Sequence, residues 1–407
     1  MTTRQAAASS PSRPVAAPRP GPNLRRRAVL GFSALGAGAA VALGAVAFMA
    51  WLFIRLSWPH VEPEGAPVFG VSFSCNQMEY LELEDPTLGR EAVPDDRPGR
   101  AEWCAARFSA LLEATGAPIA RLSAEWSDVE PEPGRYDFTL LDALLAAAER
   151  NGTTVLLTVG MKAQRHPEFY IPGWMLERTG GLEGGQVISD VPELRAGALA
   201  MAAAVVSHAA RSPAVDAWGA DNEPFVVSSR GEHWEDWRLG RDYIDALVAT
   251  IRANDPRGRP VSVNHGQHFV MDRRWQWALD AGDALATSIY PFRNDSVFGR
   301  PVVLPILEIG PLAPNYAHQA RTARARGKEF WITELQAEPW TDFDVHLVTP
   351  ENPSRNLDHR KLERNFEYAR RSGAARVYLW GGEWWLYQRD RHGDSSWMEQ
   401  ARGVMRD

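Results

Sequence analysis

The chain has 407 residues, of which 45% are hydrophobic and 23% charged, and its mean hydropathy is -0.31. These values are ordinary for a folded globular protein, and they exclude a wholly disordered chain and a multi-span membrane protein. Residues 1–55 hold seven arginines and no acidic residue, which leaves 37 basic and 51 acidic groups in the rest of the chain. Because such an acidic surface repels phosphate backbones, we expect no nucleic acid among the partners.

The first 54 residues have the pattern of a basic tail followed by a membrane anchor. Residues 1–27 are rich in Ala, Pro, Ser and Arg and show no apolar period, so we expect a disordered cytoplasmic tail. Residues 28–54 carry no charge, and this run is long enough to cross a bilayer as a helix. The three arginines at 25–27 precede the span, which predicts a cytoplasmic N-terminus and an extracytoplasmic main domain.

Two alternatives to an uncleaved anchor stay open. Arg26 and Arg27 loosely resemble a twin-arginine export signal, and Ala45-Val46-Ala47 has the small residues of a cleavage site. The same run is also compatible with a buried helix of the globular domain. The apolar residues continue past Ala47 to Ile54, which is longer than an ordinary signal core and favours the anchor.

The two cysteines leave a disulfide undecided. Cys75 follows the first predicted strand and Cys104 lies early in the next predicted helix. An extracytoplasmic domain permits a bond between them, but two separately buried thiols fit the sequence equally well. Two thiols are too few for a four-thiolate zinc site.

Residues 55–67 form a short Pro-containing linker, and residues 68–407 then alternate β-rich apolar runs with helical stretches. Near-continuous apolar strands joined by helical crossovers predict a parallel sheet covered on both faces. Eight such units fit an α/β fold with a single (β/α)8 barrel. An open doubly wound sheet usually carries a Gly-rich phosphate turn, and neither GxGxxG nor GxxxxGK[ST] occurs here. The predicted strands are 68–74, 119–123, 154–159, 215–219, 261–264, 284–288, 329–333 and 376–380.

In such a barrel the chemistry belongs at the C-terminal ends of the strands and in the loops that follow them. Polar and aromatic residues do gather at these positions. In chain order they include Arg121, Glu125, Trp126, His166, Asn222, Glu223, Asn264, His265, Tyr290, Glu334, Trp380, Glu383 and Trp384.

Four segments at these strand ends resemble the clan A retaining glycoside hydrolases. The segment AWGADNEPF (217–225) carries the Asn-Glu-Pro that ends strand four in that clan, and FWITELQAEPW (330–340) looks like the strand-seven segment with the nucleophile. The strand-two region RLSAEWSDVEPEPGRYDF (121–138) and the strand-eight end YLWGGEWW (378–385) are also similar. Families 5, 10, 39 and 42 of the clan share parts of this pattern, and the motifs do not resolve the nearest one.

The resemblance implies that Glu223 is the general acid/base and Glu334 the nucleophile of a double displacement. Arg121 and Tyr290 match the residues that would keep Glu334 ionised, and Asn222 matches the residue that binds the 2-hydroxyl of the sugar. Glu338 competes with Glu334 for the nucleophile role but lies further from the strand end. Each of these residues also has a structural alternative, such as an ion pair or a packed aromatic side chain.

The remaining candidates for sugar contacts are weaker. Trp380 ends strand eight, which suits an indole that stacks beneath the cleaved sugar. For Trp126, Trp384, His166, His265 and Glu383, a substrate contact and a structural role are about equally compatible with the sequence. The first strand has no histidine, and too few metal ligands gather at the other strand ends, so we expect neither metal nor cofactor.

The sequence therefore predicts a membrane-anchored, extracytoplasmic retaining glycoside hydrolase that acts on a β-linked polysaccharide or oligosaccharide. Its partners are this carbohydrate and the lipid bilayer, which residues 28–54 would span. A non-catalytic polysaccharide-binding barrel serving glycan export is the alternative of another class. A transglycosylase with the same two glutamates is the third possibility.

Overall fold

The structure is a computed structural model, which describes residues 38–51, 66–84, 93–226, 236–266, 272–297, 300–308, 313–340 and 345–406. The chain divides into two units, Met1–Leu56 and Ser57–Asp407. Residues 38–51 of the first unit form a helix with exposed side chains. None of the helices in the described ranges is both long and apolar enough to cross a membrane. The predicted anchor at 28–54 extends beyond the described helix at both ends.

The second unit contains the predicted eight-stranded barrel. The strands are parallel and close in the order β1-β10-β9-β6-β5-β4-β3-β2. Every predicted strand is present, and its ends shift by only a few residues. The strands are β1 (Val68–Ser72), β2 (Ile119–Ser123), β3 (Thr154–Val159), β4 (Val215–Ala220), β5 (Val261–Gly266), β6 (Ala284–Ile289), β9 (Glu329–Gln336) and β10 (Arg376–Trp380).

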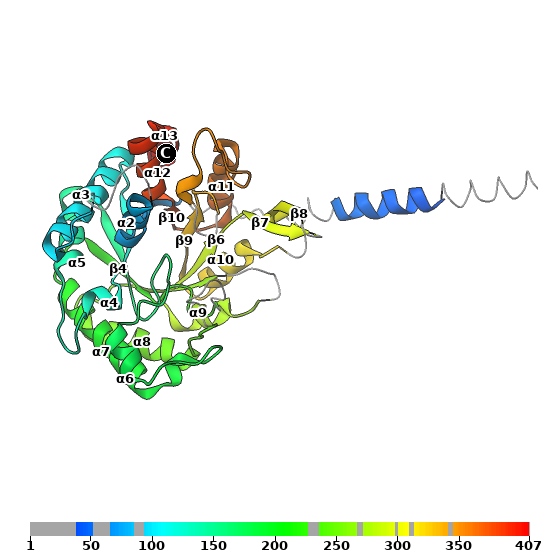
Figure 1. The fold of residues 1–407 in the computed structure, drawn as a ribbon. Helices are drawn as coiled ribbons and strands as arrows, with labels where there is room; N and C mark the ends of the chain where they lie inside the picture. The colour runs from blue at the N-terminus through cyan, green and yellow to red at the C-terminus, as the bar shows by residue number, and fades with distance from the viewer. Residues whose placement is uncertain are drawn as a thin grey trace, which may run out of the picture. The chain divides into compact units, whose positions relative to one another are not determined.

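Helices surround the barrel and connect its strands (Figure 1). Capping residues define several of them: the Asp96 side chain accepts from the Gly99 amide at the start of α3, and Gly116 ends this helix in the left-handed conformation at φ 69°. The helices are α2 (Cys75–Leu83), α3 (Arg97–Thr115), α4 (Trp126–Val129), α5 (Thr139–Arg150), α6 (Gly173–Arg178), α7 (Pro192–Ala209), α8 (Arg241–Asn254), α9 (Trp275–Ala281), α10 (Tyr316–Ala325), α11 (His359–Ser372), α12 (Gly382–His392) and α13 (Ser396–Arg406).

An antiparallel hairpin interrupts the β/α alternation after β6. It consists of β7 (Phe292–Val297) and β8 (Arg300–Pro305), and the sequence did not predict it. Its first residue is tied to the barrel, because the main chain of Phe292 exchanges hydrogen bonds of 3.0 and 2.9 Å with the side chain of Gln336 at the end of β9. The hairpin therefore begins beside the C-terminal edge of the barrel.

Two hydrophobic clusters fill the unit. The larger one lies between the strands and the helices. The smaller one joins residues from six different strands and occupies the barrel interior; it consists of Ile119, Leu156, Ala217, Ala284, Ala286, Trp331 and Tyr378. Small alanines beside Trp331 and Tyr378 let large and small side chains interdigitate in this narrow space.

A β-bulge in β9 changes which side of the barrel its residues face. Ile332 pairs with Thr287 of β6, whereas the next pair joins Glu334 to Ser288, so β9 contains one extra residue at this point. Trp331 belongs to the interior cluster and Leu335 to the outer one, although a regular strand would place both on the same face. The bulge thus directs Glu334 into the barrel mouth while Leu335 stays in the outer core.

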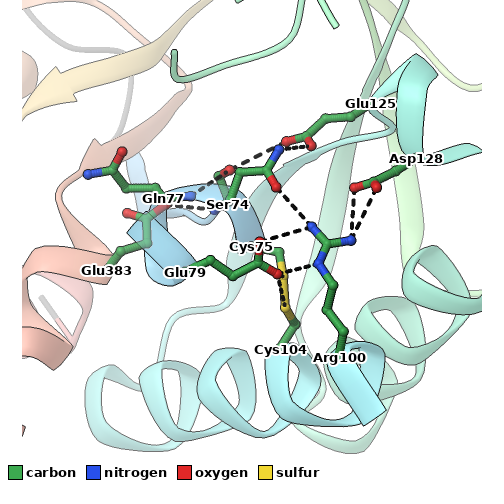
Figure 2. The surroundings of a disulfide bond; sticks show 10 residues. Ser74, Cys75, Gln77, Glu79, Arg100, Cys104, Glu125, Asp128 and Glu383 are labelled. Atoms are coloured by element: carbon green, nitrogen blue, oxygen red, sulfur yellow. Dashed lines mark hydrogen bonds and ion pairs between the residues drawn. A yellow bond between two sulfur atoms is a disulfide. The ribbon is translucent and has the colours of Figure 1, made fainter. Parts of the chain in front are cut away.

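Cys75 and Cys104 form a disulfide that joins α2 to α3, with their Cα atoms 5.6 Å apart (Figure 2). This decides between the two possibilities that the sequence left open. Beside the bond, the Arg100 guanidinium donates to both oxygens of Asp128 at 3.1 Å and also pairs with Glu79. The disulfide therefore lies within a polar network rather than in a purely apolar core.

Candidate active site

The two glutamates named by the sequence motifs reach the C-terminal mouth of the barrel. Glu334 projects from β9 and is 3% exposed, and Glu223 follows β4 and is partly buried. Strands β5 and β6 lie between β4 and β9 in the barrel. The two carboxyl groups are close enough that the charge of Glu334 raises the pKa of Glu223.

Two side chains, one from β2 and one that follows β6, fix Glu334. Arg121 of β2 donates from Nη1 to Oε1 of Glu334 at 2.7 Å, and the Tyr290 hydroxyl, just after β6, donates to Oε2 at 2.7 Å. Burial and the nearby Glu334 raise the pKa of Tyr290 well above its ordinary value, so the phenol keeps the proton that it donates. Both oxygens of Glu334 thus accept hydrogen bonds, and one bond comes from a cation. This arrangement holds the carboxylate in a single orientation.

Arg121 also links Glu334 to the loop after β4. Its Nη2 donates to Oδ1 of Asn222 at 2.6 Å, and Asn264 Nδ2 donates to the same oxygen at 3.4 Å. Because both contacts use the carbonyl oxygen of Asn222, they orient its amide nitrogen away from Arg121. The predicted hydroxyl-binding residue is therefore joined to Glu334 through Arg121, and the protein sets the orientation of its donor group.

Glu223 has the surroundings of a carboxylic acid that retains its proton. Burial, followed by the charge of Glu334, raises its pKa to about 7, although Lys162 and a hydrogen bond from Ser288 act in the opposite direction. On β5, a Cβ atom at Gly266 would lie 2.7 Å from Oε1 of Glu223. Only glycine leaves room for the carboxyl group at this place.

Trp380 ends β10 beside Tyr290, and the guanidinium of Arg165 covers its ring. The Arg165 guanidinium lies 3.8 Å from the centre of the Trp380 ring, and the Tyr290 ring meets the Trp380 ring edge-on at 6.5 Å. Arg165 is itself buried and donates to Glu383 at 2.6 Å and to both oxygens of Glu338. A buried network of charges therefore fixes the indole, and it engages Glu338, the competing candidate for the nucleophile.

Glu383 connects this network to the N-terminus of α2. Its Oε1 accepts from the main-chain amide of Ser74 at 2.6 Å (Figure 2). Its Oε2 accepts from Arg165 at 2.6 Å. Ser74 is the N-cap of α2 and precedes the disulfide-bonded Cys75. Both carboxylate oxygens of Glu383 are thus occupied by protein groups.

The other predicted contacts lie outside this cluster. Trp126 is fully buried and donates from its indole nitrogen to Glu130 at 2.8 Å. Trp384 is 1% exposed and packs edge-on against Trp397. His265 is buried, with Nε2 3.3 Å from the Gln319 amide oxygen, and His166 is exposed in the loop after β3. Their predicted role in sugar binding remains a prediction.

Sequence reasoning missed Arg165 and Lys162, which both lie in the loop after β3. Lys162 is 1% exposed, and its ammonium lies 2.8 Å from the Glu168 carboxylate. Charged residues in a loop are usually solvated, so their presence in the sequence gave no signal of burial. Within the described ranges, one group of side chains has the spacing of metal ligands, namely Cys75, Glu79 and Cys104, and its two sulfur atoms are joined in the disulfide.

One family model matches part of the chain. A family model described as β-galactosidase, of glycoside hydrolase family 42, matches residues 105–243. This stretch runs from α3 through β2, β3 and β4 and includes Arg121, Asn222 and Glu223. Among curated proteins, no sequence matches the chain.

Several solved structures align with the chain, and the first of them shares its fold. A β-galactosidase from the psychrophilic Marinomonas ef1 aligns with a TM-score of 0.54 and 15% identity over 83% of this chain and 59% of its own. The GH5_18 protein from Streptomyces cattleya aligns with a TM-score of 0.49 and 15% identity over 77% of this chain and 70% of its own. An exo-β-1,4-mannosidase from Opitutaceae bacterium strain TAV5 aligns with a TM-score of 0.47 and 16% identity over 80% of this chain and 54% of its own. The chain thus spans well under two thirds of the Marinomonas enzyme.

The family match and the closed barrel confirm the resemblance to clan A glycoside hydrolases and support an enzyme of the glycoside hydrolase class.

Proposed function

We propose that the chain is a retaining β-glycosidase that uses Glu334 as nucleophile and Glu223 as general acid/base. The observation that carries this proposal is the bridge made by Arg121, whose guanidinium binds Glu334 and Asn222 at the same time. It holds a buried carboxylate beside an oriented amide, and a second carboxyl group with a pKa of about 7 follows directly in the chain. A polysaccharide-binding barrel has no use for a buried glutamate bound by an arginine beside a second carboxyl group whose pKa is raised to about 7.

The proposed reaction has two steps. An oxygen of Glu334 attacks the anomeric carbon while Glu223 donates its proton to the departing glycosidic oxygen, which gives a glycosyl-enzyme and a free alcohol. Glu223, now ionised, then takes a proton from water, and the water displaces Glu334 from the sugar. The Asn222 amide donates to the 2-hydroxyl, and Trp380 lies beside the same site. If an acceptor sugar replaced water in the second step, the same residues would catalyse transglycosylation.

A β-linked sugar is the proposed substrate. The matching family model is described as β-galactosidase, and the solved relatives include a β-galactosidase and an exo-β-1,4-mannosidase. We therefore propose β-galactosides and β-mannosides as the first compounds to test, followed by β-linked oligosaccharides and polysaccharides. A panel of these compounds, read by release of aryl alcohol or reducing ends, tests the proposal.

The two glutamates give the decisive variants. Glu334→Ala should lower kcat by several orders of magnitude, and azide should then attack the substrate directly and give the inverted α-azide. Glu223→Ala should spare activated aryl glycosides, and azide should give the retained β-azide. Glu329→Ala is the matched control, because Glu329 lies at the opposite end of β9. An inverted first product from the wild-type protein, observed by NMR, would contradict the retaining mechanism.

We also propose that residues 28–54 anchor the protein in a membrane with the barrel outside the cytoplasm. The uncharged run of 27 residues and the arginines before it support this proposal. Protease added to intact spheroplasts should release nearly the whole barrel while the N-terminal tail stays protected. A mature protein that begins near Phe48 would instead establish a cleaved signal.

A further inference from the structure

We propose that Lys162, in the loop after β3, is a positioning residue that holds the loop after β4 in the conformation that directs the Glu223 carboxyl group into the site. This inference rests on the proposed function, in which Glu223 is the acid/base. Neither the family resemblance nor the sequence motifs drew attention to Lys162. Its contacts with the loop after β4 identify it as a candidate.

Lys162 binds the loop after β4 through three of its own polar groups. Its main-chain amide donates to Oδ1 of Asp221 at 2.6 Å, and its carbonyl accepts from the amide of Asn222 at 2.9 Å. Its Nζ donates to the carbonyl of Glu223 at 3.3 Å and to that of Val226 at 3.5 Å. One residue therefore restrains Asp221, Asn222, Glu223 and Val226 together.

This loop needs such a restraint because its backbone is strained. Asp221 has φ 56° and Glu223 has φ 43°, which places two non-glycine residues in the left-handed region on either side of Asn222. Residues in this region relax to ordinary conformations unless their surroundings hold them. A change of φ at Glu223 would rotate its carboxyl group away from Glu334 and Gly266. The hydrogen bonds of Lys162 to Asp221, Asn222 and Glu223 oppose this rotation, because they hold groups of the loop that would have to move.

A lysine suits this place better than an arginine. Only three of the 44 basic residues are lysines, at positions 162, 328 and 361, so the arginine-rich chain has a lysine where space is tight. The side chain of Lys162 is 0% exposed, and its ammonium pairs with Glu168 at 2.8 Å and lies 5.5 Å from the centre of the Phe169 ring. A compact ammonium can serve two carbonyls and a carboxylate at once, whereas a planar guanidinium is larger and fixed in shape.

The charge of Lys162 gives the inference a second readout. Lys162 lowers the pKa of Glu223, whereas burial, Glu334 and Glu168 raise it. Ser288 also faces this carboxyl group as a hydrogen-bond donor, and the phenols of Tyr290 and Tyr316 lie within reach of its charge. Loss of the ammonium leaves these other groups in place, so the pKa of Glu223 should then rise.

The test compares Lys162→Met with the wild-type full chain on a β-glycoside that the wild type cleaves. For a substrate with a poor leaving group, kcat/KM should fall by about tenfold or more, whereas an activated aryl glycoside should lose much less, because its departure needs little protonation. The alkaline limb of the pH–rate profile should move to higher pH by about 0.5 to 1 unit. Lys162→Arg should leave the alkaline limb of the pH–rate profile in place, because the positive charge is retained. It should still lower kcat/KM, because the larger guanidinium does not fit between the carbonyl groups that the ammonium binds.

Lys328→Met is the matched control. The Lys328 ammonium also donates to main-chain carbonyls, those of Leu279 at 2.6 Å and Gly282 at 2.7 Å, but it precedes β9 at the opposite end of the barrel. This variant should leave the pH profile and the ratio between the two substrates unchanged. If Lys162→Met does not fold, Lys162→Met with Glu168→Leu removes the unpaired carboxylate and allows the same measurements.

A double variant separates positioning from mere stability. In a Glu223→Ala background, adding Lys162→Met should cause no further loss of the azide-rescued rate, since the residue that Lys162 positions is already gone. An equal loss on both substrates, or a full additive loss in the Glu223→Ala background, would overturn the inference. A wild-type protein inactive on every glycoside would overturn the proposed function as well, whereas a result confined to the Lys162 variants overturns this inference alone.

Discussion

The guanidinium of Arg165, in the loop after β3, lies 3.8 Å from the ring centre of Trp380, which ends β10. Arg165 has φ 74°, a left-handed backbone that is uncommon outside glycine. Two carboxylates, Glu338 and Glu383, hold its charged end. Arg165 therefore covers one side of Trp380 and leaves the indole little freedom to rotate.

Arg165→Lys should weaken substrate binding. A lysine retains the charge but loses the planar contact with Trp380 and the paired hydrogen bonds to Glu338, so KM should rise by about tenfold. Steady-state kinetics on the best aryl β-glycoside measures this effect. Arg178→Lys is the control, because Arg178 lies 5.1 Å from the Trp174 ring in α6, away from the two glutamates. Equal effects of the two variants would argue against a role for Arg165 in the site.

Tyr290→Phe should lower kcat by about 10- to 100-fold, because it removes the hydroxyl that donates to Oε2 of Glu334 at 2.7 Å. The Arg121 contact on the other oxygen remains, so some activity should persist. Crystal structures or thermal unfolding of the variant check that the fold is intact. A variant with wild-type kcat would mean that the phenol is only a packed aromatic residue.

The pH–rate profile should report Glu223. Because burial and Glu334 raise its pKa to about 7, Glu223 holds its proton below that pH and loses it above. The first step needs the protonated form, so kcat/KM should fall as the pH rises through about 7. In Glu223→Gln, measured with an activated aryl glycoside, this alkaline limb of the pH–rate profile, the fall of kcat/KM above about pH 7, should disappear. Its persistence in that variant would assign the limb to another group.

Loss of the disulfide should destabilise the barrel. Cys75 and Cys104 are 29 residues apart, and closing a loop of this length lowers the conformational entropy of the unfolded chain enough to stabilise the fold by about 3–4 kcal/mol. Thermal unfolding with and without a reductant measures the change. In the Cys75→Ala/Cys104→Ala variant the reductant should have no effect, and this variant should match the reduced protein. An unchanged unfolding temperature after verified reduction would contradict the prediction.

The fold could be predicted from the sequence because each strand is encoded locally. Runs such as Thr154–Val159 and Ala284–Ile289 are mostly apolar, as is typical of strands buried on both faces, and helical patterns separate them. The hairpin of β7 and β8 was missed because Phe292–Val297 places four polar residues in a row between Phe292 and Val297 and so lacks the alternation of a half-buried strand. It forms against Gln336, a partner that lies far along the chain.

By itself, the sequence determined the eight-stranded barrel and drew attention to Glu223, Glu334, Arg121, Asn222 and Tyr290, because these residues stand at strand ends and parallel strands of a barrel all end at one mouth. Only the tertiary structure decided the rest. The extra residue in β9 directs Glu334 inward, and closure of the barrel brings Arg165 and Lys162 from one loop against Trp380 and Glu223. It also buries Trp126 in the core. Such contacts depend on the distances between segments far apart in the chain, and a pattern of neighbouring residues does not record those distances.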